Sequence, residues 1–194
     1  MSTGKAAAQR GLSLVELIAF IVVVGVAVTG VLAAFATTSR GSVDPMIQKQ
    51  ALSIAEAVLE EVLLMPFTYC DPDDATAATA LSATVGANGC TATVEGTGPE
   101  GGEDRYSVTV RLDNVNDYHN FDSSTASLAG IRNIDGSLIT GLTDYRVRVN
   151  VAGQALGGIG SVESLLVTVT VDGPASTTVV LHGYRARYAP NALP

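Results

Sequence analysis

The stretch QRGLSLVELIAFIVVVGVAVTGVLAAF, residues 9–35, decides how the whole chain is organised. From Leu17 to Ala36 the sequence has 20 consecutive residues without a charge. At about 1.5 Å per residue, a helix of this length crosses a hydrocarbon layer of about 30 Å. The run is longer than the apolar core of a secretory signal peptide, which has about 7–15 residues. It therefore predicts a membrane helix.

Charges on either side of this run predict its orientation. Lys5 and Arg10 precede it, Arg40 follows it, and no acid stands before Glu16. Positive charge gathers on the cytoplasmic side of membrane helices. We therefore expect the leader in the cytoplasm and everything after Arg40 outside it.

Glu16 is an acid placed just inside the apolar segment. An ionised carboxylate in lipid costs at least several kcal/mol, so such residues normally pair with a cation or mark a function. A carboxylate that simply reaches the headgroup zone is the alternative. The neighbouring sequence decides between them.

The order of a basic leader, Gly11, the motif GLSLVEL (residues 11–17) and the apolar run resembles the class III leader of type IV prepilins and pseudopilins. In that family a membrane peptidase cuts after the glycine and methylates the new amino terminus, while the helix stays attached. The resemblance implies cleavage between Gly11 and Leu12, N-methylation of Leu12, and a role for Glu16 in docking subunits. Leu12 departs from the family pattern, in which Phe is the commonest first residue.

Cleavage at this site would create a charge partner for Glu16. The new ammonium on Leu12 would lie four residues before the acid, which is about one helical turn. The pair can form within one chain or between neighbouring subunits, and the family uses the second form. The residues leave both arrangements open.

A second helical pattern follows Arg40. Asp44 and Pro45 form a helix-start signal, because Asp caps and Pro suits the first turn. One apolar stripe then continues to Pro66 at steps of three or four: Ile47, Ala51, Ile54, Val58, Val62 and Met65. We predict one long helix, kinked or briefly broken at 41–45, whose second half packs on a sheet.

Beyond Cys90 the apolar period changes to two, which is typical of strands. Five segments carry this pattern: 91–96, 105–112, 143–151, 163–173 and 177–188. They predict an antiparallel sheet of four or five strands with one buried face, and DGPAST (172–177) predicts a hairpin connection. The fold class is α+β, a helix on a sheet, as in pilins.

Several later segments resemble a narrower group, the minor pilins of the mannose-sensitive haemagglutinin (MSHA) pilus and their PilV-like relatives. They are VDP with its following helix, DNVNDYHNFD (113–122) and GYRARYAPN (183–191). The resemblance implies a pilus subunit whose partners are other pilins, the prepilin peptidase and the inner-membrane assembly platform. It also implies a bacterial inner-membrane protein with a periplasmic C-terminal domain, later part of a surface filament.

The sequence therefore predicts four parts in the chain. Residues 1–11 are the leader, 12–40 the transmembrane and assembly helix, 41–66 the spine of the outer domain, and 67–194 the sheet domain. A type II secretion pseudopilin is the alternative within the family. A single-pass membrane-anchored binding protein or adhesin is the alternative of another class.

Cys70 and Cys90 lie 20 positions apart, without the spacing of a metal site. Outside the cytoplasm we expect them to form a disulfide. By closing this loop, the disulfide would stabilise the fold by about 3 kcal/mol. Two buried free thiols are the alternative.

Other classes of function find little support in the sequence. The net charge of −8 argues against nucleic-acid binding. His119 and His182 are the only histidines, and no catalytic motif accompanies them. We expect no enzymatic activity and no cofactor.

An oxygen-rich segment is the one candidate for a metal. Calcium takes six to eight oxygen ligands, and five residues within 113–122 offer them: Asp113, Asn114, Asn116, Asp117 and Asp122. Their spacing departs from that of an EF-hand, because Val115 occupies a ligand position. Asp and Asn also serve turns, so the pattern favours a turn-forming role over a calcium site.

Overall fold

The computed structural model describes residues 13–124 and 130–193. The chain divides into two units, Met1–Pro45 and Met46–Pro194. Gly11 and Leu12 lie outside the described residues, so their cleavage and methylation stay predictions.

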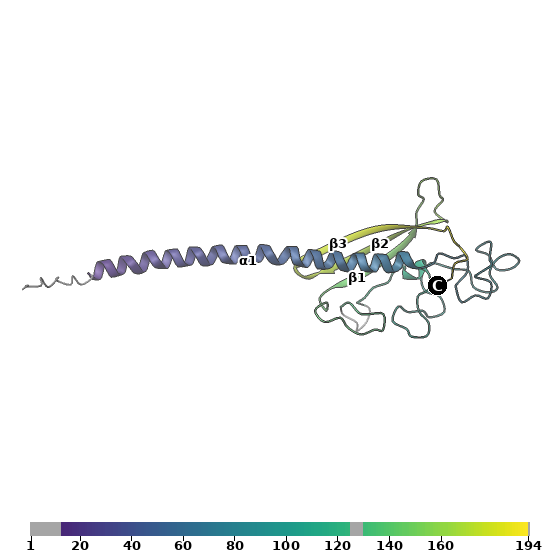
Figure 1. Cartoon of the computed structure of the whole chain (residues 1–194), viewed down its shortest axis with the longest axis horizontal. Helices are drawn as coiled ribbons and strands as arrows, with labels where there is room; N and C mark the ends of the chain where they lie inside the picture. Colours follow the sequence, from purple (N-terminus) through teal and green to yellow (C-terminus); the bar gives the residue numbers. More distant parts are fainter. Residues whose placement is uncertain (1–12, 125–129, 194) are drawn as a thin grey trace, which may run out of the picture. The chain divides into compact units, whose positions relative to one another are not determined.

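One helix, α1 (Leu14–Leu64), contributes to both units (Figure 1). Its segment Leu14–Phe35 has 22 residues and a mean hydropathy of 2.8, which suffices by length and composition to cross a membrane. A membrane anchor and a signal sequence both meet this description.

The helix continues through Pro45. The prediction of one long helix is therefore confirmed, whereas a break at 41–45, which we considered beside a kink, does not occur. Proline lacks an N–H and normally interrupts the hydrogen bonds of a helix, but its fixed φ of about −65° is itself helical. The strongly amphipathic sequence that follows it outweighs the loss of one hydrogen bond.

The second unit is built on the C-terminal part of α1. Its buried side chains form the predicted stripe, and the most enclosed of them are Ala51, Ile54, Ala55, Val58 and Val62. Ile47 and Met65, at the two ends of the stripe, pack against the same core. This part of the sequence analysis is confirmed.

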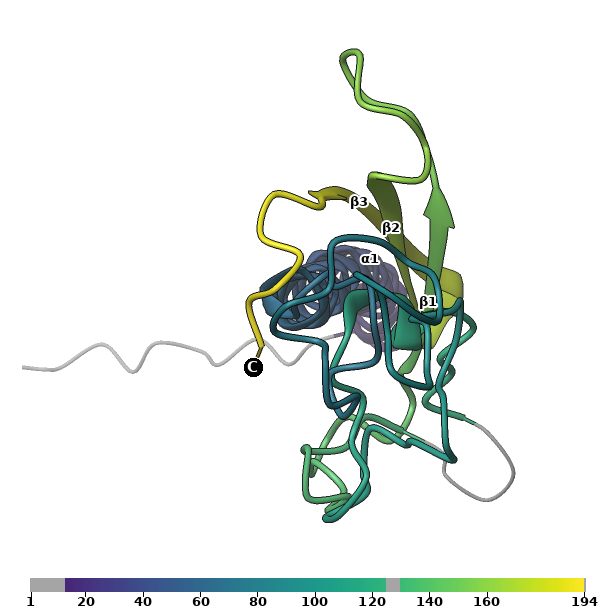
Figure 2. The same ribbon diagram turned by 90° about the vertical axis from the view of Figure 1, so that its right-hand side faces the viewer.

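The stripe packs on a three-stranded antiparallel sheet in the order β1 (Arg146–Gly153), β2 (Ser164–Gly173) and β3 (Thr177–Ala186). Figure 2 shows the three strands on one side of α1. Val149 pairs with Val169, which also pairs with Leu181. On β1 each valine is buried and each intervening polar residue is exposed, as the alternation predicts.

The close approach of β3 to the helix depends on Gly183. A Cβ built on this residue would lie 2.8 Å from Cδ1 of Leu63 and 3.1 Å from Cδ1 of Leu59. The predicted hairpin joins β2 to β3 through the short turn Pro174–Ser176.

Only three strands form among the described residues, fewer than the four or five that we predicted. Residues 91–96 contribute one isolated bridge, from Val94 to Cys70. Residues 105–112 form no strand. Both runs have the composition of strands, but neither finds a continuous partner edge.

Local hydrogen bonds replace the missing strand at 105–112. The hydroxyl oxygen of Ser107 accepts hydrogen bonds from the backbone N–H groups of Thr109 and Val110. Such side-chain acceptors compete with strand pairing. Val108, which a strand would bury, is 80% exposed.

The irregular region between α1 and β1 is tied to the helix through Glu61. Arg105 donates from Nε and Nη2 to the two carboxylate oxygens of Glu61, at 2.6 Å each. The hydroxyl of Tyr118 donates to Glu61 Oε1 at 2.9 Å. Arg105 also donates to the carbonyl oxygen of Arg132, so the ion pair and its hydrogen bonds connect α1 with the segments that contain Arg105, Tyr118 and Arg132.

We predict that Glu61→Gln lowers the free energy of unfolding by about 3 kcal/mol, because it leaves the enclosed Arg105 guanidinium without its counter-charge. Denaturant unfolding of the full chain in mild detergent, followed by near-ultraviolet circular dichroism, measures the change. Glu60→Gln is the matched control, since Glu60 is exposed. Equal stability of the two variants would contradict the anchoring role of Glu61.

Candidate functional site

The start of α1 contains the predicted assembly residue, Glu16. Its backbone N–H donates to Oγ of Ser13 at 3.2 Å, and the N–H of Leu17 donates to the Ser13 carbonyl oxygen at 3.1 Å. Ser13 therefore caps the helix, and Glu16 lies in the first turn, where the helix dipole favours an acid. The sequence analysis missed this cap, although the Ser-x-x-Glu pattern is its usual signal.

Every residue from Ser13 to Phe35 is exposed in its unit. Phe20 and Phe35, for example, are 64% and 67% exposed. Such a continuous apolar surface far exceeds the scattered exposed apolar residues of ordinary soluble proteins, and it marks contact with lipid or with other proteins.

Cys70 and Cys90 form the predicted disulfide, with their Cα atoms 5.4 Å apart. Both residues are fully buried, in a small cluster with Ala77 and Ala80. The disulfide fixes the first loop after α1.

Asp74 also stabilises this loop, through hydrogen bonds. Its carboxylate accepts hydrogen bonds of 2.7–2.9 Å from the backbone N–H groups of Thr76, Thr91, Ala92 and Thr93. These bonds, that from Thr93 foremost, hold the pKa of Asp74 well below its usual range. No spacing rule in the sequence indicates this role.

The five residues considered for calcium do not form one ligand set. Asn114 and Asp117 form a reciprocal cap on the short helix η1 (Val115–Tyr118). Asp122 instead pairs with Arg146 on β1. The contiguous segment therefore supplies turn contacts, as the sequence favours, but two of its acids also belong to a larger group.

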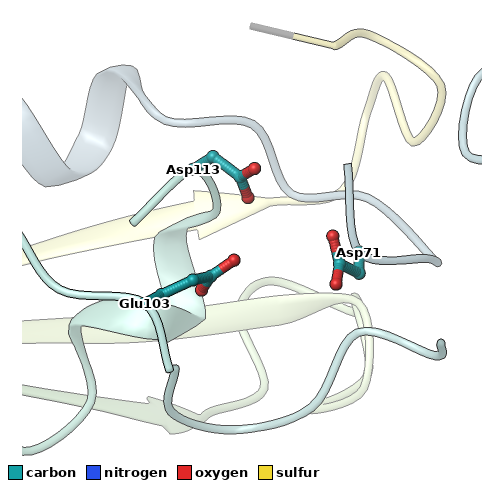
Figure 3. Close-up of side chains that lie close together, drawn as sticks. All are labelled: Asp71, Glu103 and Asp113. Carbon is teal, nitrogen blue, oxygen red and sulfur yellow. The ribbon is translucent and has the colours of Figure 1, made fainter. Parts of the chain in front are cut away.

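Six carboxylates from separate segments lie together in two neighbouring trios. The inner trio is Glu95, Glu100 and Asp117, and the outer trio is Asp71, Glu103 and Asp113. Within each trio, one carboxylate oxygen from each residue lies within 4.8 Å of the other two. Figure 3 shows the outer trio, whose carboxylates come from three segments and face a common space. We call the six residues the carboxylate cluster.

Burial and mutual repulsion alter the acidity of this cluster. Burial, followed by the charges of Asp117 and Asp113, raises the pKa of Glu103 to about 8. Burial and the charge of Asp71 raise the pKa of Asp113 to about 6. Burial also raises the pKa of Glu95 and Asp117 in the inner trio. The sequence analysis identified Asp113 and Asp117 but missed the other four residues, which lie in distant segments.

Glu103 and Asp117 also line a surface cavity of about 450 Å³. His119 lines it too, and its Nδ1 lies 2.7 Å from the carbonyl oxygen of Val151. His182, on β3, lies beside Thr168. The two histidines thus contact different strands.

Comparison of the chain with models of protein families, with curated proteins and with solved structures gave no match in any of the three.

We predict that the free energy of unfolding, measured with a chelator present, falls by about 2 kcal/mol between pH 5 and pH 8. Four carboxyls of the cluster, those of Glu95, Glu103, Asp113 and Asp117, have folded-state pKa values above their unfolded values of about 4. The folded state therefore binds more protons, and stability is lost as the pH rises. The expected change is smaller than the separate shifts suggest, because solvent screens the partly exposed groups.

Denaturant titrations at several pH values test this expectation. Glu95→Gln should flatten the dependence, whereas Glu60→Gln should leave it unchanged. Stability that rises with pH in the wild-type chain would contradict it. Asp74 acts in a different window, since its depressed pKa makes stability fall only as the pH drops below about 4.

Proposed function

We propose that this chain is a minor pilin, a structural or priming subunit of a type IV filament of the MSHA kind. The observation that carries the proposal is the helix start. Glu16 stands in the first turn of an exposed apolar helix, directly after a segment that resembles the prepilin leader. In this proposal the prepilin peptidase cuts before Leu12, and the helix enters the filament.

The chemistry of Glu16 supports an intermolecular partner. Its backbone N–H is already bonded to Ser13, but its side chain makes no ion pair among the described residues. In an apolar filament core an ionised carboxylate needs a cation nearby. The N-methylated amine of Leu12 on a neighbouring subunit supplies one and fixes the register of the two chains.

The second unit supports display of a folded domain outside the cytoplasm. Its Cys70–Cys90 disulfide suits an oxidising compartment such as the periplasm. The proposed partners are other pilins, the prepilin peptidase and the inner-membrane assembly platform. We propose no enzymatic role, because His119 and His182 contact separate strands and neither joins a catalytic arrangement among the described residues.

We predict that Glu16→Ala is processed normally but enters filaments at a level at least about tenfold lower, because the neighbouring amine loses its partner. Mass spectrometry of the mature amino terminus measures processing, and quantification in sheared filaments from the native cells measures incorporation. Wild-type incorporation of Glu16→Ala would refute the docking role.

Ser13→Ala separates docking from helix capping. It removes the cap, which is worth about 1 kcal/mol, but keeps the acid. We expect it to be incorporated nearly as well as the wild type. A loss equal to that of Glu16→Ala would mean that the acid acts through the helix start alone. An intact leader on the mature chain would overturn the prepilin proposal, and a processed chain missing from filaments would point to a secretion pseudopilin.

A further inference from the structure

The inner trio of the carboxylate cluster brings three acids from two segments into one small space. Glu95 and Glu100 belong to the loop after the disulfide, and Asp117 belongs to η1. One carboxylate oxygen from each of the three residues lies within 4.8 Å of the other two. Three carboxylates so close together repel one another unless something positive lies between them.

Asp117 is the most deeply buried member, at 1% exposed. Its Oδ2 accepts hydrogen bonds from the backbone N–H groups of Asp113 and Asn114, at 3.0 and 2.6 Å. Its Oδ1 is buried and has no donor, and the same is true of Glu95 Oε1. A buried acceptor without a donor is costly and rare in folded proteins. Two such oxygens in one trio indicate a missing positive partner.

The protein supplies no such partner within the described residues. The arginines that form ion pairs there are bound to acids outside the cluster: Glu61, Asp122, Glu163 and Asp172. The hydrogen bonds found to the cluster carboxylates all come from backbone N–H groups. A proton or an external cation is left to bridge the facing oxygens.

We propose that the inner trio binds a divalent cation, Ca²⁺ in preference to Mg²⁺. Oxygen atoms on opposite sides of a Ca²⁺ ion are about 5 Å apart, since each lies about 2.3–2.6 Å from the metal. The spacing within the trio is compatible with this span. Mg²⁺ keeps most of its waters and uses one or two carboxylates, whereas three carboxylates converge here.

Neighbouring groups favour the same ion. The charges of the outer trio act on the inner one, as between Glu103 and Asp117, and so increase the negative potential that attracts a cation. This ligand set differs from the contiguous one considered in the sequence, because Glu95 and Glu100 are essential to it and Asp122 takes no part.

Cation binding would stabilise the irregular region between α1 and β1. The cation would join the loop that carries Glu95 and Glu100 to η1, which in turn contacts Glu61 through Tyr118. Since no strand forms in the described part of this region, one ion is expected to stabilise it markedly.

The full chain in detergent micelles, stripped with EDTA, provides the test. We expect saturable Ca²⁺ binding by titration calorimetry and a melting temperature that rises by about 5–10 °C at a Ca²⁺ concentration of about 100 times the dissociation constant. Mg²⁺ at the same concentration should raise it much less. No saturable Ca²⁺ binding would overturn the proposal in favour of a shared proton, and an equal or larger effect of Mg²⁺ would overturn the preference for Ca²⁺.

Two conservative variants locate the site. Glu95→Gln and Glu100→Gln should each abolish the Ca²⁺ response while keeping the fold in EDTA, because an amide supplies the donor that the trio lacks. Glu60→Gln and Asp122→Asn should retain the response. A response kept by both Glu95→Gln and Glu100→Gln, or lost in Asp122→Asn alone, would assign the cation elsewhere and overturn the proposal. These Ca²⁺ experiments do not measure filament incorporation. A negative result would therefore contradict the cation site and leave the pilin proposal unaffected.

Discussion

The carboxylate of Glu61 is the contact on which the arrangement of the second unit most depends. It projects from the C-terminal part of α1 and receives hydrogen bonds from both Arg105 and Tyr118. The sheet packs on the other side of the helix through the apolar core, and Arg185 on β3 adds a hydrogen bond to the carbonyl oxygen of Met65. The long region between α1 and β1 has no strand of its own among the described residues. Leu112, Val115 and Tyr118 pack into the core, and the hydrogen bonds of Glu61 join the same region to α1.

The helix and the strands of the sheet could be predicted from the sequence, because buried apolar residues repeat with the period of the element that carries them. The stripe through Ile54 and Val58 repeats with the period of a helix, and the alternation in β1 repeats with the period of a strand. Pro45 was misleading, since a local rule predicted a break that its helical neighbours override. Residues 105–112 were misleading in the opposite way, because strand-like composition cannot show whether a partner edge exists.

The candidate sites could be predicted only where their residues are close in sequence. Glu16 and its distance from Gly11 are visible in one motif, and the cysteine pair stands out because only two cysteines occur. The carboxylate cluster joins Asp71, the 95–103 loop and residues 113–117, and their meeting depends on the path of an irregular chain. Acids are common in loops, so composition alone gave no reason to group these six.

The first loop after α1 is held both by a disulfide and by hydrogen bonds, so its conformation does not depend on the disulfide alone. The disulfide joins Cys70 to Cys90, and the carboxylate of Asp74 independently grips the backbone at Thr91, Ala92 and Thr93. A newly made chain with reduced thiols can therefore form this loop before any oxidant reaches Cys70 and Cys90. The fold would then guide the two cysteines together, and oxidation would lock a conformation that hydrogen bonds had already selected.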